Sequence, residues 1–147
     1  MFSSLGAYLL LLPLTALAQD AKPNFSGTWA VRDFEVDRID HTEPTIAISP
    51  KIRRADVIPT FVFRTDGTEV RSRSGNNEVV RTGHWDGNFL VLETKWIGSG
   101  AERTEQDILS LSEDGKVMTK HTRIYAPDKE VDDMLQFRKT SEAIRGK

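Results

Sequence analysis

The segment Trp85-Asp86-Gly87-Asn88-Phe89-Leu90-Val91 decides the fold that we expect for this chain. An Asp-Gly pair between two strand-like runs is one of the strongest short-range signals for a β-hairpin, because both turn residues must tolerate a positive φ. The same pair recurs at Asp66-Gly67 and at Asp114-Gly115. Three such pairs so close together predict a meander in which each strand folds back on the one before it.

Short β-prone runs extend this pattern on both sides. The first begins at Gly27, the last covers residues 134–138, and Gly, Pro and Asn residues mark the turns between them. Only residues 32–43 are too charged to suggest a regular strand. No segment shows a sustained helical period. We therefore expect an all-β fold of about eight to ten strands, which has to close into a sandwich or a barrel. Hairpin connections throughout favour an antiparallel up-and-down meander closed into a barrel.

The hairpin at Asp86-Gly87 predicts which side chains share a face. A two-residue loop places Gly83 opposite Leu90, and one face then holds Arg81, Trp85, Leu90, Leu92 and Trp96. The other face carries Phe89 and several polar residues. Both faces are mixed, which suits a barrel wall with a partly polar interior. We expect the first face to point inward, because it has more aromatic side chains.

The other two Asp-Gly pairs predict further pairings. A two-residue loop at Asp66-Gly67 pairs Phe63 with Val70. A three-residue loop at Asp114-Gly115 places Asp107 opposite His121 on one face. A carboxylate beside an imidazole suits a general base, but a structural hydrogen bond needs the same two residues.

The first 18 residues have the pattern of a secretory signal peptide. Leucines form a short apolar core at residues 9–14, and Ala16-Leu17-Ala18 is a cleavage site with small residues in the right places. No Lys or Arg precedes the apolar core, and an N-terminal membrane anchor is the less favoured alternative. We expect one domain over residues 19–138, a flexible polar tail over residues 139–147, and a secreted or periplasmic location.

Composition excludes several classes of partner. The chain has 20 basic and 22 acidic residues, and so nearly balanced a surface argues against a nucleic-acid binder or a binder of anionic membranes. We expect no stable membrane insertion after signal cleavage. The chain has no Cys, so its stability has to come from packing and sheet hydrogen bonds rather than from disulfides. The sequence leaves the oligomeric state open.

Residues 24–138 resemble small exported bacterial proteins of the lipocalin-like, or calycin, superfamily. Ser26-Gly27-Thr28-Trp29 is similar to the Gly-x-Trp signature of that superfamily, and the Trp85-Asp86-Gly87 hairpin resembles one in its bacterial members. The Thr-Asp-Tyr loop motif and the cysteines of typical lipocalins are absent. The resemblance implies a lipocalin-like barrel. It also implies that Gly27 and Trp29 close one barrel end and that Arg138 packs over the indole of Trp29.

Motifs for catalysis or metal binding are not found. The three histidines, His41, His84 and His121, have no metal-ligand spacing, and the chain lacks a Gly-x-Ser-x-Gly elbow and a Gly-rich phosphate loop. We expect no metal, no cofactor and no catalytic residues, so an enzyme is the least favoured class.

Two function classes remain. The first is a binding module for an apolar or amphipathic small molecule, entered from the barrel end opposite Trp29. Its candidate site residues are Arg81, Trp85, Leu90, Leu92 and Trp96, with Arg81 as partner of an acidic head group. The second is a structural or protein-interaction module of the cell envelope with a filled barrel. A barrel of about eight strands is wide enough for either outcome.

Overall fold

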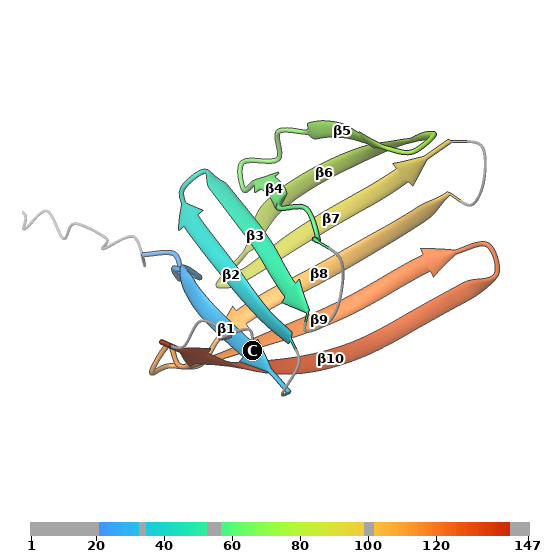
Figure 1. The fold of residues 1–147 in the computed structure, drawn as a ribbon. Helices are drawn as coiled ribbons and strands as arrows, with labels where there is room; N and C mark the ends of the chain where they lie inside the picture. Colours follow the sequence, from blue (N-terminus) through green and yellow to red (C-terminus); the bar gives the residue numbers. More distant parts are fainter. Residues whose placement is uncertain (1–20, 33–34, 53–56, 99–101, 142–147) are drawn as a thin grey trace, which may run out of the picture.

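Ten antiparallel strands form one sheet in the computed structural model, which describes residues 21–32, 35–52, 57–98 and 102–141 (Figure 1). The strands are β1 (Gly27–Val31), β2 (Glu35–Thr42), β3 (Thr45–Ile52), β4 (Phe61–Arg64), β5 (Val70–Ser74), β6 (Asn77–Asp86), β7 (Phe89–Ile97), β8 (Arg103–Leu111), β9 (Val117–Ala126) and β10 (Lys129–Thr140). These residues contain no helix, and hence none that is long and apolar enough to span a membrane. The predicted all-β antiparallel fold is confirmed.

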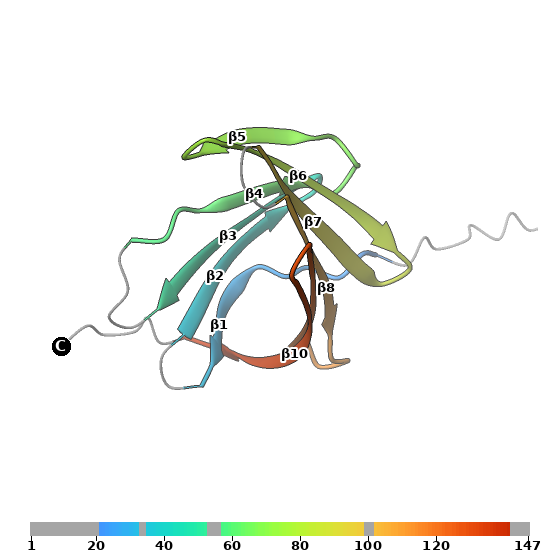
Figure 2. The ribbon, with the colours of Figure 1, turned by 90° about the vertical axis from the view of Figure 1, so that its right-hand side faces the viewer.

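The sheet order explains how the meander becomes a barrel. It runs β4-β3-β2-β1-β10-β9-β8-β7-β6-β5, so each strand lies beside its sequence neighbour except at two places. β10 returns to pair with β1, and β4 and β5 form the two ends of the sheet. Figure 2 looks into the barrel, whose wall curves round from β1 to β10 and β8. The barrel is nearly closed, and its seam lies between β4 and β5.

The seam closes where β4 approaches β6. The amide of Gly67 donates a 2.9 Å hydrogen bond to the carbonyl oxygen of Gly83. A Cβ atom at Gly83 would lie only 3.0 Å from the carbonyl oxygen of Arg64 and 3.1 Å from Cδ2 of Leu92. Glycine at this position therefore lets the two ends of the sheet come together.

The turn at Asp66-Gly67 is present, but the predicted pairing of Phe63 with Val70 is wrong. Phe63 pairs with Ile46 on β3, and Val70 pairs with Arg81 on β6. The Asp66 carboxylate accepts hydrogen bonds from the amide of Thr68 at 3.0 Å and from Nη2 of Arg64 at 2.7 Å. This local network turns the chain across the seam without pairing its two flanking strands.

The hairpin at Asp86-Gly87 is confirmed, with a different register. Trp85 lies opposite Leu90, and Gly83 lies opposite Leu92 rather than Leu90. The two-residue loop consists of Gly87 and Asn88. A shift by two residues leaves every side chain on its predicted face, because side chains alternate with a period of two.

The third hairpin is also present, but its loop is longer than predicted. Leu111 pairs with Met118, and the side chains of Ser112 and Asp114 hold the loop by bonding to amides within it. The register changes by one residue, so Asp107 lies opposite Thr122 and His121 lies opposite Ile108. The predicted Asp107–His121 pair is therefore wrong, because a one-residue shift moves the two side chains to opposite faces.

One barrel end is closed around Trp29, which is completely buried. Its indole N–H donates a 2.8 Å hydrogen bond to the carbonyl oxygen of Phe25. Nζ of Lys139 lies 5.4 Å from the centre of the Trp29 ring, and Lys139 is also the residue opposite Trp29 on β10. This corrects the predicted role of Arg138, which lies opposite Ala30 and points to the other face of β10. β10 also continues to Thr140, beyond the point where we expected the tail to begin.

Glycine at position 27 fits the same arrangement. Its φ is +143°, and a Cβ atom there would lie 2.7 Å from Cε of Lys139. A side chain at this position would displace the lysine that covers Trp29.

The rings of Phe25, His41 and Trp85 add a second layer to the closed end. Their centres lie 6.0 to 6.1 Å apart. Nδ1 of His41 accepts a hydrogen bond from the amide of Phe25 at 3.2 Å, so the other ring nitrogen, Nε2, donates to the Glu43 carboxylate at 3.1 Å. The predicted signal peptide, residues 1–18, lies outside the described residues.

Candidate functional site

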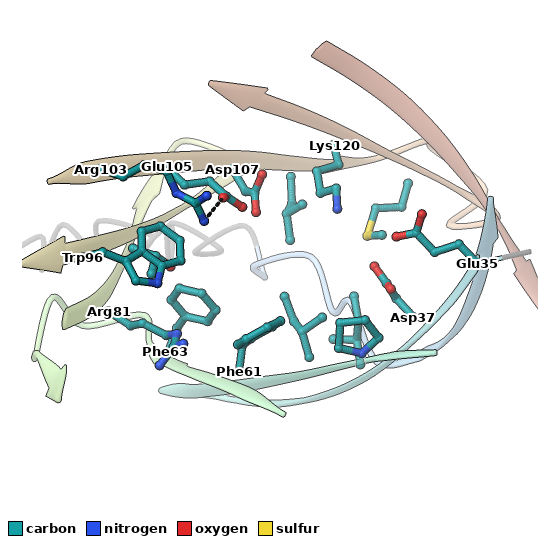
Figure 3. A pocket seen from close by; sticks show the side chains of 16 residues that line it. Glu35, Asp37, Phe61, Phe63, Arg81, Trp96, Arg103, Glu105, Asp107 and Lys120 are labelled. Atoms are coloured by element: carbon teal, nitrogen blue, oxygen red, sulfur yellow. Dashed lines mark ion pairs between the residues drawn. The ribbon is translucent and has the colours of Figure 1, made fainter. Parts of the chain in front are cut away.

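A cavity of about 200 Å³ lies inside the barrel (Figure 3). Its apolar wall comes from five strands and includes Ile39, Ile48, Phe61, Phe63, Leu109 and Met118. Neither Trp29 nor Phe25, His41 and Trp85 of the closed end lines it. The cavity is larger than the engineered cavities of about 150 Å³ that hold benzene. The interior of this barrel is therefore not filled by its own side chains.

The cavity wall also carries many charges. Glu35, Asp37, Glu105 and Asp107 contribute four carboxyl groups, and Arg81, Arg103 and Lys120 contribute three cations. Of these seven residues Asp37 is buried and Arg103 is exposed, and the other five are partly buried. A buried charged side chain is rarely left without a partner, so Asp37 is the one that needs explanation.

Two arginines stand at one end of the cavity, beside Trp96 (Figure 3). The guanidinium of Arg103 stacks 3.9 Å from the centre of the Trp96 ring, and its Nη2 lies 3.6 Å from Oε2 of Glu105. Arg103 is therefore already engaged with an aromatic ring and a carboxylate.

Arg81 is less well paired than Arg103. Its guanidinium lies 5.0 Å from the centre of the Phe61 ring, and its Nη1 donates a 3.0 Å hydrogen bond to the hydroxyl of Ser72. Its Nε is buried and has no acceptor among the described residues. Burial lowers the pKa of Arg81, and no carboxylate acts against that effect. Arg81 therefore presents a positive charge to the cavity without a matching anion.

Asp37 stands at the opposite end of the cavity (Figure 3). Its side chain is almost completely buried, and its Oδ1 has no hydrogen-bond donor among the described residues. Burial raises the pKa of Asp37 from its ordinary value of 3.8 to about 6. Repulsion by Glu35 and Asp107 adds to the effect of burial, while attraction by Lys120 opposes it.

Asp107 and Glu105 occupy the β8 wall between these ends. Burial raises the pKa of both carboxyl groups. Asp107 also accepts a hydrogen bond from the hydroxyl of Thr122, and Lys120 attracts it, and both effects lower its pKa. Asp107 therefore has a hydrogen-bond donor, which Oδ1 of Asp37 lacks.

The five predicted ligand-binding residues do point inward, but the structure separates them. Arg81 and Trp96 line the cavity. Leu90 and Leu92 belong to the buried core and do not reach it. Trp85 lies at the closed end, where its indole N–H donates a 2.8 Å hydrogen bond to Glu43. Phe89 of the other face is 51% exposed.

Several cavity residues were not among the five predicted ligand-binding residues. Phe61 and Phe63 are aromatic residues of a predicted strand. Their place in the cavity wall follows only when β4 is known to lie across the barrel from β6 and β8. Asp37 gave no signal, because residues 35–42 form strand β2 where we expected irregular structure. A polar residue in a strand is ordinarily assigned to the solvent face, yet Asp37 points inward with Ile39 and His41.

The histidines do not form a joint site. His41 is held at the closed end, while His121 lies 2.5 Å from Oδ1 of the exposed Asp132 and His84 is exposed. Within the described ranges, no three His, Cys, Asp or Glu side chains are grouped so that they could hold a metal ion.

Comparison with known proteins adds no relative: the chain matches no protein-family model and no curated protein. The proposed function therefore depends on the residues and the geometry of the cavity.

Proposed function

We propose that this protein is a binding module that holds a small amphipathic molecule in the barrel cavity, with an anionic group of the ligand at Arg81. The observation that carries the proposal is the Nε of Arg81, which is buried beside the cavity without an acceptor. Leaving a buried charged donor unsatisfied is costly, and a ligand carboxylate would supply the acceptor.

The lining and the volume of the cavity support a small ligand with an apolar body. Phe61 and Phe63 lie next to Arg81 in the cavity wall (Figure 3). Ligand sites typically combine apolar and aromatic walls with a few polar groups that orient the ligand. A volume of about 200 Å³ limits the ligand to a small molecule, such as a short-chain or aromatic carboxylate.

The barrel is compatible with membership of the lipocalin-like, or calycin, superfamily, which the Gly27-x-Trp29 motif suggested. We extend the proposal to that superfamily and to a secreted or periplasmic location after cleavage of residues 1–18. Ligand entry from the barrel end opposite Trp29 belongs to the same proposal. It is supported by the tight packing of Phe25, Trp29 and Lys139 at the closed end.

Isothermal titration calorimetry with octanoate tests the proposal. We expect saturable binding to the wild type and about tenfold weaker binding to Arg81→Gln, since a hydrogen-bonded charge pair is lost. Arg73→Gln is the matched control, because Arg73 lies on the same hairpin but is exposed on its outer face. Its affinity for octanoate should equal that of the wild type.

A second measurement does not depend on the choice of octanoate. Mass spectrometry of small molecules extracted from the purified protein should find an acid that Arg81→Gln does not retain. If no acid co-purifies and no carboxylate binds, the protein-interaction module is the better description of this barrel.

A further inference from the structure

Asp37 is the second buried group in the cavity that lacks a partner. The residue is 4% exposed, its side chain points into the cavity (Figure 3), and its buried Oδ1 has no donor among the described residues. A buried carboxylate oxygen without a hydrogen bond is strongly unfavourable. A group that persists in this state is a candidate for contact with a ligand.

The neighbouring strands offer Asp37 no side-chain donor. Pro50 lies opposite Asp37 on β3, and Trp29 lies opposite it on β1. Proline has no donor at all, and the indole N–H of Trp29 already donates to the carbonyl oxygen of Phe25. The residues opposite Asp37 on both neighbouring strands therefore provide no hydrogen-bond donor for its side chain.

The charges near Asp37 favour a cation over a neutral donor. Glu35 and Asp107 repel its carboxylate, and Lys120 is the attracting cation, pointing into the cavity between Asp107 and Asp37 (Figure 3). Asp37 is thus repelled by two carboxyl groups and attracted by one ammonium group. A ligand ammonium would balance the charge and donate to Oδ1 of Asp37 at the same time.

We propose that the Asp37 end of the cavity is a subsite for a protonated amine. The inference rests on the proposed function, and together the two describe an amphoteric ligand. Its anionic group lies at Arg81, its ammonium group lies at Asp37, and its apolar body lies against Phe61 between them (Figure 3). Small amino carboxylates with an aliphatic or aromatic body are the corresponding chemical class.

The test compares omega-amino carboxylates of increasing chain length with the unsubstituted carboxylates of the same lengths, by isothermal titration calorimetry. Wild-type protein should bind the amino compound about tenfold more tightly at the chain length that spans the cavity, since a charge-assisted hydrogen bond is added. Asp37→Asn should abolish this preference while the protein still binds the unsubstituted carboxylate. Asp40→Asn is the control, because Asp40 is exposed on the outer face of the same strand.

The possible failures are distinguishable. Equal affinity of wild type for the two members of every pair would overturn the amine subsite and leave the anion site at Arg81 intact. A crystal structure of the complex that shows only an ordered water at Oδ1 of Asp37 would also overturn it. If neither series binds, the proposed function falls and the amine subsite falls with it. The wild-type comparison decides the question even if Asp37→Asn fails to fold.

Discussion

The indole N–H of Trp85 donates a 2.8 Å hydrogen bond to the carboxylate of Glu43, which is 42 residues earlier in the chain. The same carboxylate accepts hydrogen bonds from Nε2 of His41 and the hydroxyl of Thr65. Burial acts to raise the pKa of Glu43, but these three hydrogen bonds together hold it below its ordinary value. One carboxylate therefore joins three elements at the closed end of the barrel, which are β2, β6 and the turn that follows β4.

Glu43→Ala should lower the free energy of unfolding by about 1–2 kcal/mol, because three donors lose their acceptor at a partly solvated site. Urea denaturation monitored by tryptophan fluorescence measures the change. Glu113→Ala, in the exposed loop after β8, should leave the stability unchanged. Equal midpoints for the two variants would contradict the structural role of Glu43.

Replacement of Lys139 should destabilise the barrel more than replacement of Arg138. The Lys139 side chain covers the ring of Trp29, whereas Arg138 is exposed on the other face of β10. We expect Lys139→Ala to cost about 1 kcal/mol and Arg138→Ala less than about 0.5 kcal/mol. Trp29→Ala should cost about 3–5 kcal/mol, the range for truncating a large buried aromatic side chain. Thermal unfolding of the three variants ranks them, and the reverse order for positions 138 and 139 would restore the original prediction.

The exchange of roles between Arg138 and Lys139 shows where sequence reasoning succeeds and fails. The faces of β6 and β7 were predicted correctly although their register was not, because an error of two residues preserves the alternation. The Asp107–His121 pair and the position of Arg138 were each wrong by one residue, and an error of one reverses the face. For Asp107 and His121 the error came from the length of the third loop, in which the amide of Lys116 donates a hydrogen bond to Asp114. The position of Arg138 was instead implied by the resemblance to lipocalin-like proteins.

Local sequence patterns could not predict the seam or the inward position of Asp37. Asp66-Gly67 predicts a turn, but only the long-range sheet order determines that β4 and β5 lie at opposite ends of the sheet. Asp37 is a polar residue in a strand that points inward. No local propensity distinguishes it from Asp40, which points outward three residues later.

Gly83→Ala should open the seam. The added methyl group would lie 3.0 Å from the carbonyl oxygen of Arg64, and a backbone atom cannot move away as a side chain can. We expect a loss of about 1–3 kcal/mol from overpacking. Hydrogen exchange of the Gly67 amide, which bonds to the Gly83 carbonyl, should become faster than in the wild type. Thr82→Ala is the control, because Thr82 is the adjacent residue on the opposite face of β6. If the Gly67 amide exchanges equally fast in this variant, the effect is not specific to the seam.

Asp37 should make the protein less stable as the pH rises from about 4 to about 6. Burial raises the pKa of Asp37 to about 6 in the folded protein, whereas the unfolded chain has the ordinary value of 3.8. The folded state then binds the proton more tightly, so this stabilisation is complete below the lower pKa and is lost as the pH rises through the higher one. The loss amounts to something on the order of 3 kcal/mol.

Asp37→Asn isolates this contribution from the other carboxyl groups. Asp66 and Asp114 are held by hydrogen bonds from Arg64 and Ser112, which keep both pKa values low, so their contribution to stability is lost only on further acidification. The variant should therefore be more stable than the wild type at neutral pH, and the difference should shrink as the pH falls toward about 4, where Asp37 is protonated. Urea denaturation across this pH range gives both curves. A constant difference between them would show that Asp37 keeps its ordinary pKa in the folded protein, and that its carboxylate is solvated rather than buried without a partner.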